Sequence, residues 1–206
     1  MLHGSASEAY PTPSHIAIAF SPRRDDNPFM ATATFIPIDV YLHTTYRPDC
    51  DYIDGEVRER NVGEISHSFL QSLLAAIFNR NSRTWQVVAG TELRIQVAPN
   101  RFRIPDVCVK RRSDPSDPIL RIAPLICIEV LSPDDTLSSM QDRFDDYFQM
   151  GVPHVWLLDP YRRRGYTATK TSLEEAASGE LTVPGTPIRL ALPEVFAELD
   201  GMLSES

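Results

Sequence analysis

The strongest constraint in this sequence is an apolar segment, Pro124 to Leu131, which contains the run Leu-Ile-Cys-Ile-Glu-Val-Leu. An almost uninterrupted apolar stretch of this kind is typical of a central strand that is covered on both faces. Side chains alternate along a strand, so Cys127, Glu129 and Leu131 share one face. The segment therefore predicts a buried strand that carries a carboxylate.

Glu129 is the residue of this strand that needs an explanation. A buried carboxylate is costly unless it is paired, hydrogen-bonded or bound to a cation. A salt bridge at the end of the strand would satisfy Glu129, and so would a metal ion. The residue alone leaves both readings open.

A second carboxylate, Asp106, opens the run Asp-Val-Cys-Val, which also predicts a buried strand. If the two strands are neighbours, Asp106 and Glu129 converge on one point. Two hard oxygen ligands with open positions for water suit Mg²⁺ or Mn²⁺ rather than zinc. Pro-Asp pairs also begin ordinary turns, so Pro105-Asp106 alone is weak evidence for a metal site. It indicates such a site only because Glu129 follows at strand spacing.

The remaining elements are predicted from periodicity and turn residues. Asp54-Gly55 predicts a hairpin turn within residues 52–57. Apolar residues at helical spacing predict helices over 64–79, over 137–148 with Gly151 as the C-terminal cap, and over 192–203. Strands are expected over 85–88, 92–97, 102–109, 154–159 and 166–170, and a short helix or loop over 173–179. This order indicates a mixed sheet flanked by a few helices, in the α/β to α+β range.

Composition bounds the class of protein. The chain has 206 residues, 42% hydrophobic and 23% charged, so residues 37–206 are expected to form one globular domain. Residues 1–36 mix Pro, Ser, Thr and Ala and predict a disordered or loosely docked extension. No run approaches the length of a membrane-spanning helix, and the start lacks the features of a signal peptide, so no membrane partner is expected.

The cysteines and the net charge limit the cellular compartment and the binding partners that can be expected. Cys50, Cys108 and Cys127 are scattered and show no CxxC spacing, so free thiols in a reducing, cytoplasmic compartment are expected. The net charge of -8 argues against sequence-independent coating of DNA, which depends on Lys and Arg. It does not exclude a nuclease, because active-site carboxylates count towards that total. A protein-interaction domain that binds no nucleic acid also fits the acidic charge.

Several segments together resemble the Uma2 family. They are Pro105-Asp106, residues 129–133, Tyr147 and the string Gly-Val-Pro-His-Val-Trp-Leu-Leu-Asp-Pro at 151–160, preceded by residues 52–57 and the helix that bears His67. The resemblance covers about residues 38–200. Uma2 proteins belong to the PD-(D/E)XK nuclease superfamily. The resemblance therefore implies a restriction-endonuclease-like fold, a mixed central sheet flanked by helices, and a metal-dependent endonuclease that acts on DNA.

The resemblance also implies site residues. Asp106 and Glu129 would hold Mg²⁺ or Mn²⁺, with the main-chain carbonyl of Val130 as a candidate third ligand. The ion would polarise the scissile phosphate and lower the pKa of an attacking water. His67 lies on the rim of its helix's apolar face, where a packing role and a site role are both open. Weaker candidates for a further ligand or its surroundings are Glu64 and Glu56.

Two positions depart from the superfamily's pattern. Leu131 stands where the basic residue two places after the Glu is expected, and Uma2-like sequences supply that residue from the following helix, where this chain has Arg143. The helical Asp expected four residues earlier is Ser139. Arginine can stabilise negative charge on a phosphate, but it stays protonated and is no base. The alternative is therefore a degenerate nuclease scaffold that binds nucleic acid or protein without turnover.

Two basic clusters are candidates for phosphate contacts. Lys110, Arg111 and Arg112 follow the strand of Asp106 and could reach phosphates that flank the metal. Residues 162–164 are three arginines in a late turn. Ordinary solvated basic turns would account for both clusters as well. An exposed strand over 92–97 could meet its copy across a two-fold axis in a homodimer.

Overall fold

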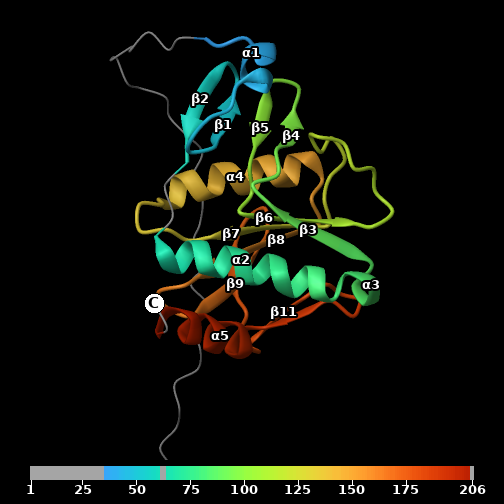
Figure 1. Ribbon diagram of the computed structural model, residues 1–206, viewed down its shortest axis with the longest axis vertical. Coiled ribbons are helices and arrows are strands. Elements are labelled where there is room, and N and C mark those ends of the chain that lie inside the picture. The colour runs from blue at the N-terminus through green and yellow to red at the C-terminus, as the bar shows by residue number, and fades with distance from the viewer. Residues whose placement is uncertain (1–34, 61–63, 205–206) are drawn as a thin grey trace, which may run out of the picture.

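A six-stranded mixed sheet forms the centre of the protein, in a computed structural model that describes residues 35–60 and 64–204 (Figure 1). Its strands lie in the order β10-β9-β8-β7-β6-β3. The parallel pair is β7 with β8, and the other neighbours are antiparallel. The strands are β3 (Val87–Thr91), β6 (Val107–Arg111), β7 (Ile126–Val130), β8 (His154–Asp159), β9 (Arg164–Ala168) and β10 (Leu173–Glu175).

A second, four-stranded sheet has the order β2-β1-β5-β4. It consists of β1 (Cys50–Ile53), β2 (Glu56–Glu59), β4 (Ile95–Ala98) and β5 (Arg101–Arg103). The short helix α1 (Ile38–His43) packs against it through an aromatic cluster of Tyr41, Tyr52 and Phe102. A two-stranded sheet of β11 (Glu180–Thr182) and β12 (Arg189–Ala191) precedes the last helix.

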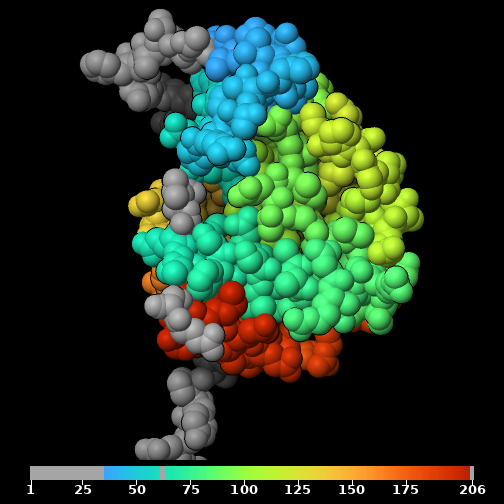
Figure 2. Space-filling view, in the orientation of Figure 1, coloured from blue at the N-terminus to red at the C-terminus, as the bar shows by residue number. Residues whose placement is uncertain are grey.

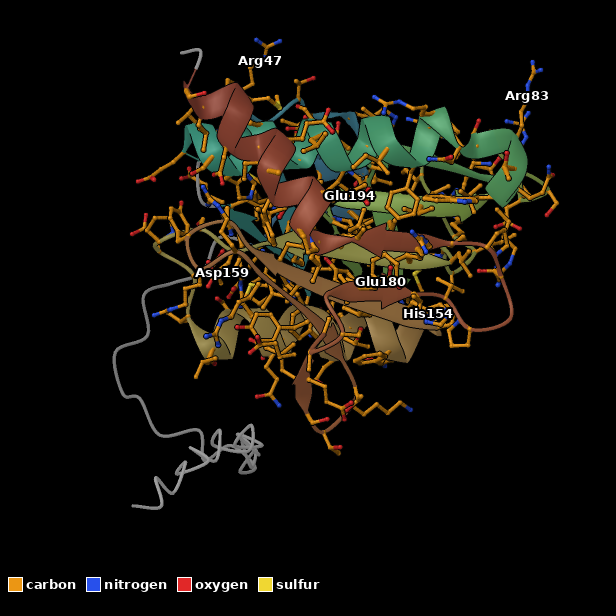
Figure 3. All side chains as sticks on the ribbon, turned by 90° about the horizontal axis from the view of Figure 1, so that it is seen from below. Arg47, Arg83, His154, Asp159, Glu180 and Glu194 are labelled. Carbon is orange, nitrogen blue, oxygen red and sulfur yellow. The ribbon has the colours of Figure 1, made fainter. Side chains whose placement is uncertain are left out.

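The helices divide between the two faces of the main sheet. Helices α2 (Ile65–Arg80) and α5 (Leu192–Ser204) lie on one face, and α4 (Leu137–Met150) lies on the other (Figures 1 and 3). Helix α4 is therefore held between the main sheet and the four-stranded sheet (Figure 1). The one-turn helix α3 (Ser82–Trp85) follows α2. In the space-filling view, α1 and the β1–β2 hairpin form the upper part, α2 crosses the middle and α5 lies below (Figure 2).

Two apolar clusters fill the space on the two faces of the main sheet. On the side of α2 and α5, β7 contributes Ile126, Ile128 and Val130. On the side of α4, β7 contributes Cys127, with Leu131 packed beside it. The predicted alternation along this strand is thus confirmed, and Glu129 faces α4.

Helix α4 begins and ends on residues suited to those positions. Thr136 and Ser139 form a capping box, in which each side chain accepts a hydrogen bond from the other residue's main-chain N–H. Gly151 ends the helix with φ of 94°, the left-handed conformation that glycine adopts without steric cost. Gly151 was predicted as this cap, and Ser139, which replaces the superfamily's Asp, is used in starting the helix.

The mixed α/β fold and most of its elements agree with the sequence-based prediction. The Asp54-Gly55 turn joins β1 and β2, with φ of 51° and 100°. The helices expected over 64–79, 137–148 and 192–203 and the strands expected over 154–159 and 166–170 are α2, α4, α5, β8 and β9, with small shifts of their ends. The extension predicted over residues 1–36 lies outside the described residues except for Phe35 and Ile36.

Four predicted segments differ. The strand expected over 102–109 is two strands, β5 and β6, in different sheets, because the chain turns at Pro105, which has no N–H to donate to a ladder. The segment 173–179, expected as a helix or loop, begins with β10. Trp85 ends α3 instead of opening a strand, and only Ile95 to Val97 of the predicted 92–97 are in β4.

Two further expectations concern chemistry and membranes. Cys50, Cys108 and Cys127 are buried free thiols, and the latter two belong to the cluster beneath α4. Within residues 35–60 and 64–204, no helix combines the length and apolar character needed to cross a bilayer.

Candidate active site

The two predicted carboxylates lie side by side. Asp106 immediately precedes β6, and Glu129 lies on β7, where Val107 is opposite Ile128 in the antiparallel register. Both side chains are buried, with exposed fractions of 3% and 0%. They lie near the end of the main sheet at which β7 and β8 finish. Asp159 marks this end of β8, and Figure 3 shows it at the opposite end of that strand from His154.

Asp106 is held by four groups. Its Oδ2 accepts a hydrogen bond of 2.7 Å from the main-chain N–H of Val130 and lies 3.3 Å from Nε2 of His67. Its Oδ1 lies 2.5 Å from Nη2 of Arg60. The side chain of Gln71 donates to the main-chain oxygen of Asp106 over 3.0 Å. Helix α2 therefore contributes two side chains that fix the position of this carboxylate.

Glu129 is held mainly by α4. Tyr147 donates its hydroxyl hydrogen to Oε1 of Glu129. Arg143 Nη1 donates to Oε2 over 3.0 Å, and Arg60 Nη2 lies 3.5 Å from the same oxygen. Arg143 and Tyr147 are one helical turn apart, so both reach Glu129, which faces α4.

Arg60 is the residue of this centre that sequence reasoning missed. It follows β2, and its Nη2 contacts both carboxylates. Its side chain is 11% exposed, and its Nε has no hydrogen-bond partner among the described residues. Its local sequence gave no signal, because Arg60 follows a polar hairpin strand and its partners are distant in the chain.

The pKa values of the two carboxyl groups are shifted in opposite directions. Burial alone would raise the pKa of Asp106, but the charge of Arg60 and the hydrogen bonds of His67 and Val130 hold that pKa well below its usual range. Burial raises the pKa of Glu129 from 4.5 to about 7, against the charge of Arg143 and with the help of the nearby Asp106 charge. Opposed pKa shifts of neighbouring carboxyl groups are typical of functional sites.

His67 and Arg60 respond to the same carboxylates. Burial lowers the pKa of His67, but its hydrogen bond to Asp106 and the charge of Asp106 outweigh this, so the pKa is raised above 6.5. Burial likewise opposes the charge of Arg60, and Asp106 and Glu129 raise its pKa well above the ordinary value. The centre therefore favours a charged Arg60 and a protonated His67.

These shifts predict how stability depends on pH. Glu129 binds its proton more tightly in the folded state, so its contribution to the free energy of unfolding falls as pH rises from 4.5 through about 7. The contribution of His67 is complete below 6.5 and is lost as pH rises through its raised pKa. Urea unfolding at about pH 5 and about pH 8 should show a smaller loss of stability in Glu129→Gln than in wild type. An equal loss in both proteins would contradict the shift.

The other predicted site residues divide. Val130 lies in the centre, where its main-chain N–H binds Asp106, and its carbonyl remains a candidate metal ligand. Glu64 accepts a hydrogen bond from the hydroxyl of Tyr161, and Glu56 pairs with Arg58 on the exposed side of β2. Glu64 and Glu56 thus pair with Tyr161 and Arg58 and not with the two carboxylates.

The first basic cluster lies at the far end of its strand. Lys110 and Arg111 are the last residues of β6, whereas Asp106 precedes that strand. Arg111 lies near enough to His154 to lower the pKa of that imidazole, although burial is the larger cause. His154 begins β8, whereas Glu129 lies beside the last residues of that strand. Lys110 to Arg112 therefore lie at the other end of the strands from Glu129 (Figure 3).

The second basic cluster lies nearer but is ion-paired. Arg162 lies 3.5 Å from Asp159, Arg163 pairs with Asp200 of α5, and Arg164 pairs with Glu175 of β10. Of the three, Arg162 is the most exposed, at 73%. It is therefore the member of this turn that is best placed to meet a ligand at the Asp159 edge.

The predicted dimer strand is covered along part of its length. Gln96 donates its main-chain N–H to the oxygen of Leu120, and Leu120 donates to the oxygen of Arg94. β4 is a terminal strand of its sheet, and this segment lies along its outer edge.

A divalent ion is implied by the resemblance, and the donors present can be tested for it. One cationic nitrogen, Nη2 of Arg60, lies 2.5 Å from an oxygen of Asp106 and 3.5 Å from an oxygen of Glu129, so the two carboxylates already share one cation. The hydroxyl of Ser132 is also buried beside them without a partner among the described residues. No cluster of three or more His, Cys, Asp or Glu able to hold a metal occurs in the described part of the chain. Two carboxylates still suffice for Mg²⁺, which keeps several waters. The donor set fits such an ion.

Comparison with protein families matches residues 40–198 to Uma2, a family described as "Putative restriction endonuclease". The fold is similar to the crystal structure of a "putative nuclease belonging to DUF820" from Anabaena variabilis ATCC 29413, with a TM-score of 0.68 and 23% identity over 80% of this chain and 99% of the other. At that identity the likeness establishes the fold alone.

Similarity to other proteins is weak or absent. The cryo-EM structure of a DrdV–DNA complex matches with a TM-score of 0.34 and 15% identity, over 64% of this chain and 10% of the other, and carries no argument. The search of curated proteins gives no match.

Proposed function

Since the chain belongs to the Uma2 family, we propose that it is an endonuclease that hydrolyses phosphodiester bonds in DNA at Asp106 and Glu129, with Mg²⁺ or Mn²⁺ as cofactor. The observation that carries the proposal is the contact of one cationic nitrogen with an oxygen of each buried carboxylate. Two acidic side chains that can share one cation are what metal-assisted hydrolysis requires of a protein.

Asp106 and Glu129 would hold the ion, and the hydroxyl of Ser132 lies in the same small cavity. When bound, the ion supplies a Lewis acid for the phosphate and lowers the pKa of a bound water. The chain's other residues orient these ligands. The N–H of Val130 and the imidazole of His67 fix Oδ2 of Asp106, and the Tyr147 hydroxyl fixes Oε1 of Glu129.

Arg143 would supply fixed positive charge. Its side chain is 12% exposed and borders the small cavity that Asp106 also lines. A permanently charged group beside the phosphate stabilises the negative charge that develops on it, and needs no proton transfer. Arg143 can therefore replace the electrostatic role of the superfamily's lysine, but not any role as a base.

Cleavage of supercoiled plasmid DNA by the purified full-length protein tests the proposal. Nicking is expected with Mg²⁺ or Mn²⁺ and not with EDTA. Asp106→Asn should lower the rate by on the order of 100-fold, since a precisely placed charge is lost. Asp117→Asn, at an exposed loop position, is the matched control and should cleave like wild type. Cleavage by a folded Asp106→Asn protein at the wild-type rate would refute the assignment.

A binding module without turnover is the second candidate, and one observation favours it. Arg60 and Arg143 together already neutralise both carboxylates. This candidate predicts DNA binding that strengthens as salt falls, without cleavage even at high Mn²⁺. An Arg143→Lys variant separates the two, because a gain of cleavage indicates an attenuated nuclease.

A further inference from the structure

The contacts of Arg60 have a consequence for metal binding, and it rests on the proposed function, which makes Asp106 and Glu129 the ligands of the ion. We propose that Arg60 is a built-in competitor of the divalent ion: its guanidinium and the ion exclude each other, so the ion binds only after Arg60 has left the two carboxylates. The metal affinity of the protein is then set by this side chain as well as by the ligands.

The geometry places both cations at one point. Arg60 uses the same atom, Nη2, to reach Oδ1 of Asp106 at 2.5 Å and Oε2 of Glu129 at 3.5 Å. Mg²⁺ requires its oxygen ligands at about 2.0–2.1 Å. An ion bound between these two oxygens would therefore overlap the nitrogen that now lies between them.

The size of the cavity leads to the same conclusion. The space bounded by the carboxylate of Asp106 and by Arg60, His67 and Arg143 has a volume of about 10 Å³. That is close to the least volume that holds one water molecule. Mg²⁺ gives up its hydration shell reluctantly and usually keeps several waters. With Arg60 in place, there is no room for an ion that carries them.

Charge makes the exclusion stronger. Arg60 and Arg143 already balance the two negative charges of Asp106 and Glu129, and His67 adds positive charge when protonated. A divalent ion added to this buried group would face two guanidinium groups in a poorly screened setting. Removal of one guanidinium lowers the positive charge of the centre by one, which favours the binding of a cation.

Arg60 is the better suited of the two arginines to leave. Arg143 lies within α4 and pairs with Glu129, whereas Arg60 follows β2, a terminal strand of the four-stranded sheet. Its Nε is buried without a partner among the described residues, and an unmet buried donor carries a desolvation cost. The bound position of Arg60 is thus favoured by the carboxylates and opposed by its own burial.

Titration of the full-length protein with Mn²⁺ by calorimetry tests the inference. Arg60→Met keeps the apolar stem and removes the charge, and should bind Mn²⁺ about 10-fold more tightly than wild type. Arg58→Met, two residues earlier in β2, removes an exposed arginine that pairs with Glu56, and should bind like wild type. Arg60→Lys retains a charge and should not gain the affinity of Arg60→Met.

Thermal unfolding with and without Mn²⁺ guards against a misfolded variant. Arg60→Met leaves two carboxylates with less positive charge, so it should melt below wild type without the ion and recover more than wild type when Mn²⁺ is added. Equal Mn²⁺ affinity in wild type and Arg60→Met, or no binding to either, would overturn the inference. Tighter binding by Arg60→Met without DNA cleavage by any variant would support it while refuting the proposed nuclease activity.

Discussion

Replacement of Asp146 by alanine is expected to lower the free energy of unfolding by about 3–5 kcal/mol. Asp146 is 2% exposed and accepts hydrogen bonds of 2.6 Å from Arg103 and 2.8 Å from Arg101. Arg103 is itself buried and donates at the same time to Asp51 over 2.8 Å. Loss of one carboxylate would leave a buried guanidinium half neutralised, and such a group is costly.

Urea unfolding measures the effect, and the chain offers a matched control. Asp200 also pairs with an arginine, Arg163, but its side chain is 57% exposed. Exposed ion pairs contribute about 0–1 kcal/mol, so Asp200→Ala should change stability little. Equal losses for Asp146→Ala and Asp200→Ala would show that burial of the first pair does not matter.

The same variant should also disturb the centre. Asp146 belongs to α4, between Arg143 and Tyr147, which hold Glu129. The ion pairs of Asp146 connect this helix to β5 of the four-stranded sheet. We therefore expect any nuclease activity to fall in Asp146→Ala even under conditions where most of the protein is folded.

The second large effect is expected from Glu129→Gln, which should slow DNA cleavage by on the order of 100-fold or more. Glutamine retains the shape of the side chain and can still accept the Tyr147 hydrogen bond. It removes the negative charge that the proposed ion requires. Single-turnover rates on plasmid DNA at saturating Mn²⁺ give the comparison.

Two controls separate this loss from misfolding. Glu129→Gln leaves Arg143 with a weaker partner, so the double variant Glu129→Gln/Arg143→Met restores the balance of charge and should recover stability but not cleavage. Glu180→Gln changes an exposed glutamate that pairs with Arg189 and should cleave normally. Wild-type cleavage by a folded Glu129→Gln protein would exclude Glu129 from the chemistry.

The sequence was informative where local rules suffice. The Asp54-Gly55 turn, the Gly151 cap and the apolar run of β7 each depend on neighbouring residues, and the structure agrees with all three. The break at Pro105 was missed because alternation continues across it while the chain passes from one sheet to the other. Residues 173–175 were missed as β10 because their strand character comes from pairing with β9.

In the candidate site as well, some residues were predictable from the sequence and others were not. Asp106 and Glu129 were predicted to converge if their two buried strands are neighbours, and the structure pairs β6 with β7. Arg60 could not be predicted, because its partners lie 46 and more residues away and its local sequence is that of an ordinary polar hairpin. Tyr147 was among the residues that resemble Uma2, but nothing local indicated that its hydroxyl donates to Glu129.

The β1–β2 hairpin carries both a structural ion pair and the approach to the candidate active site. Asp51 of β1 lies opposite Arg58 of β2 and binds Arg103, while Arg60 lies two residues further along. The hairpin therefore connects to α4 through Asp51 and Arg103. The same hairpin leads directly into Arg60, the cation beside Asp106 and Glu129. A tilt of this hairpin would change the mechanical coupling to α4 and the charge beside the carboxylates in a single movement.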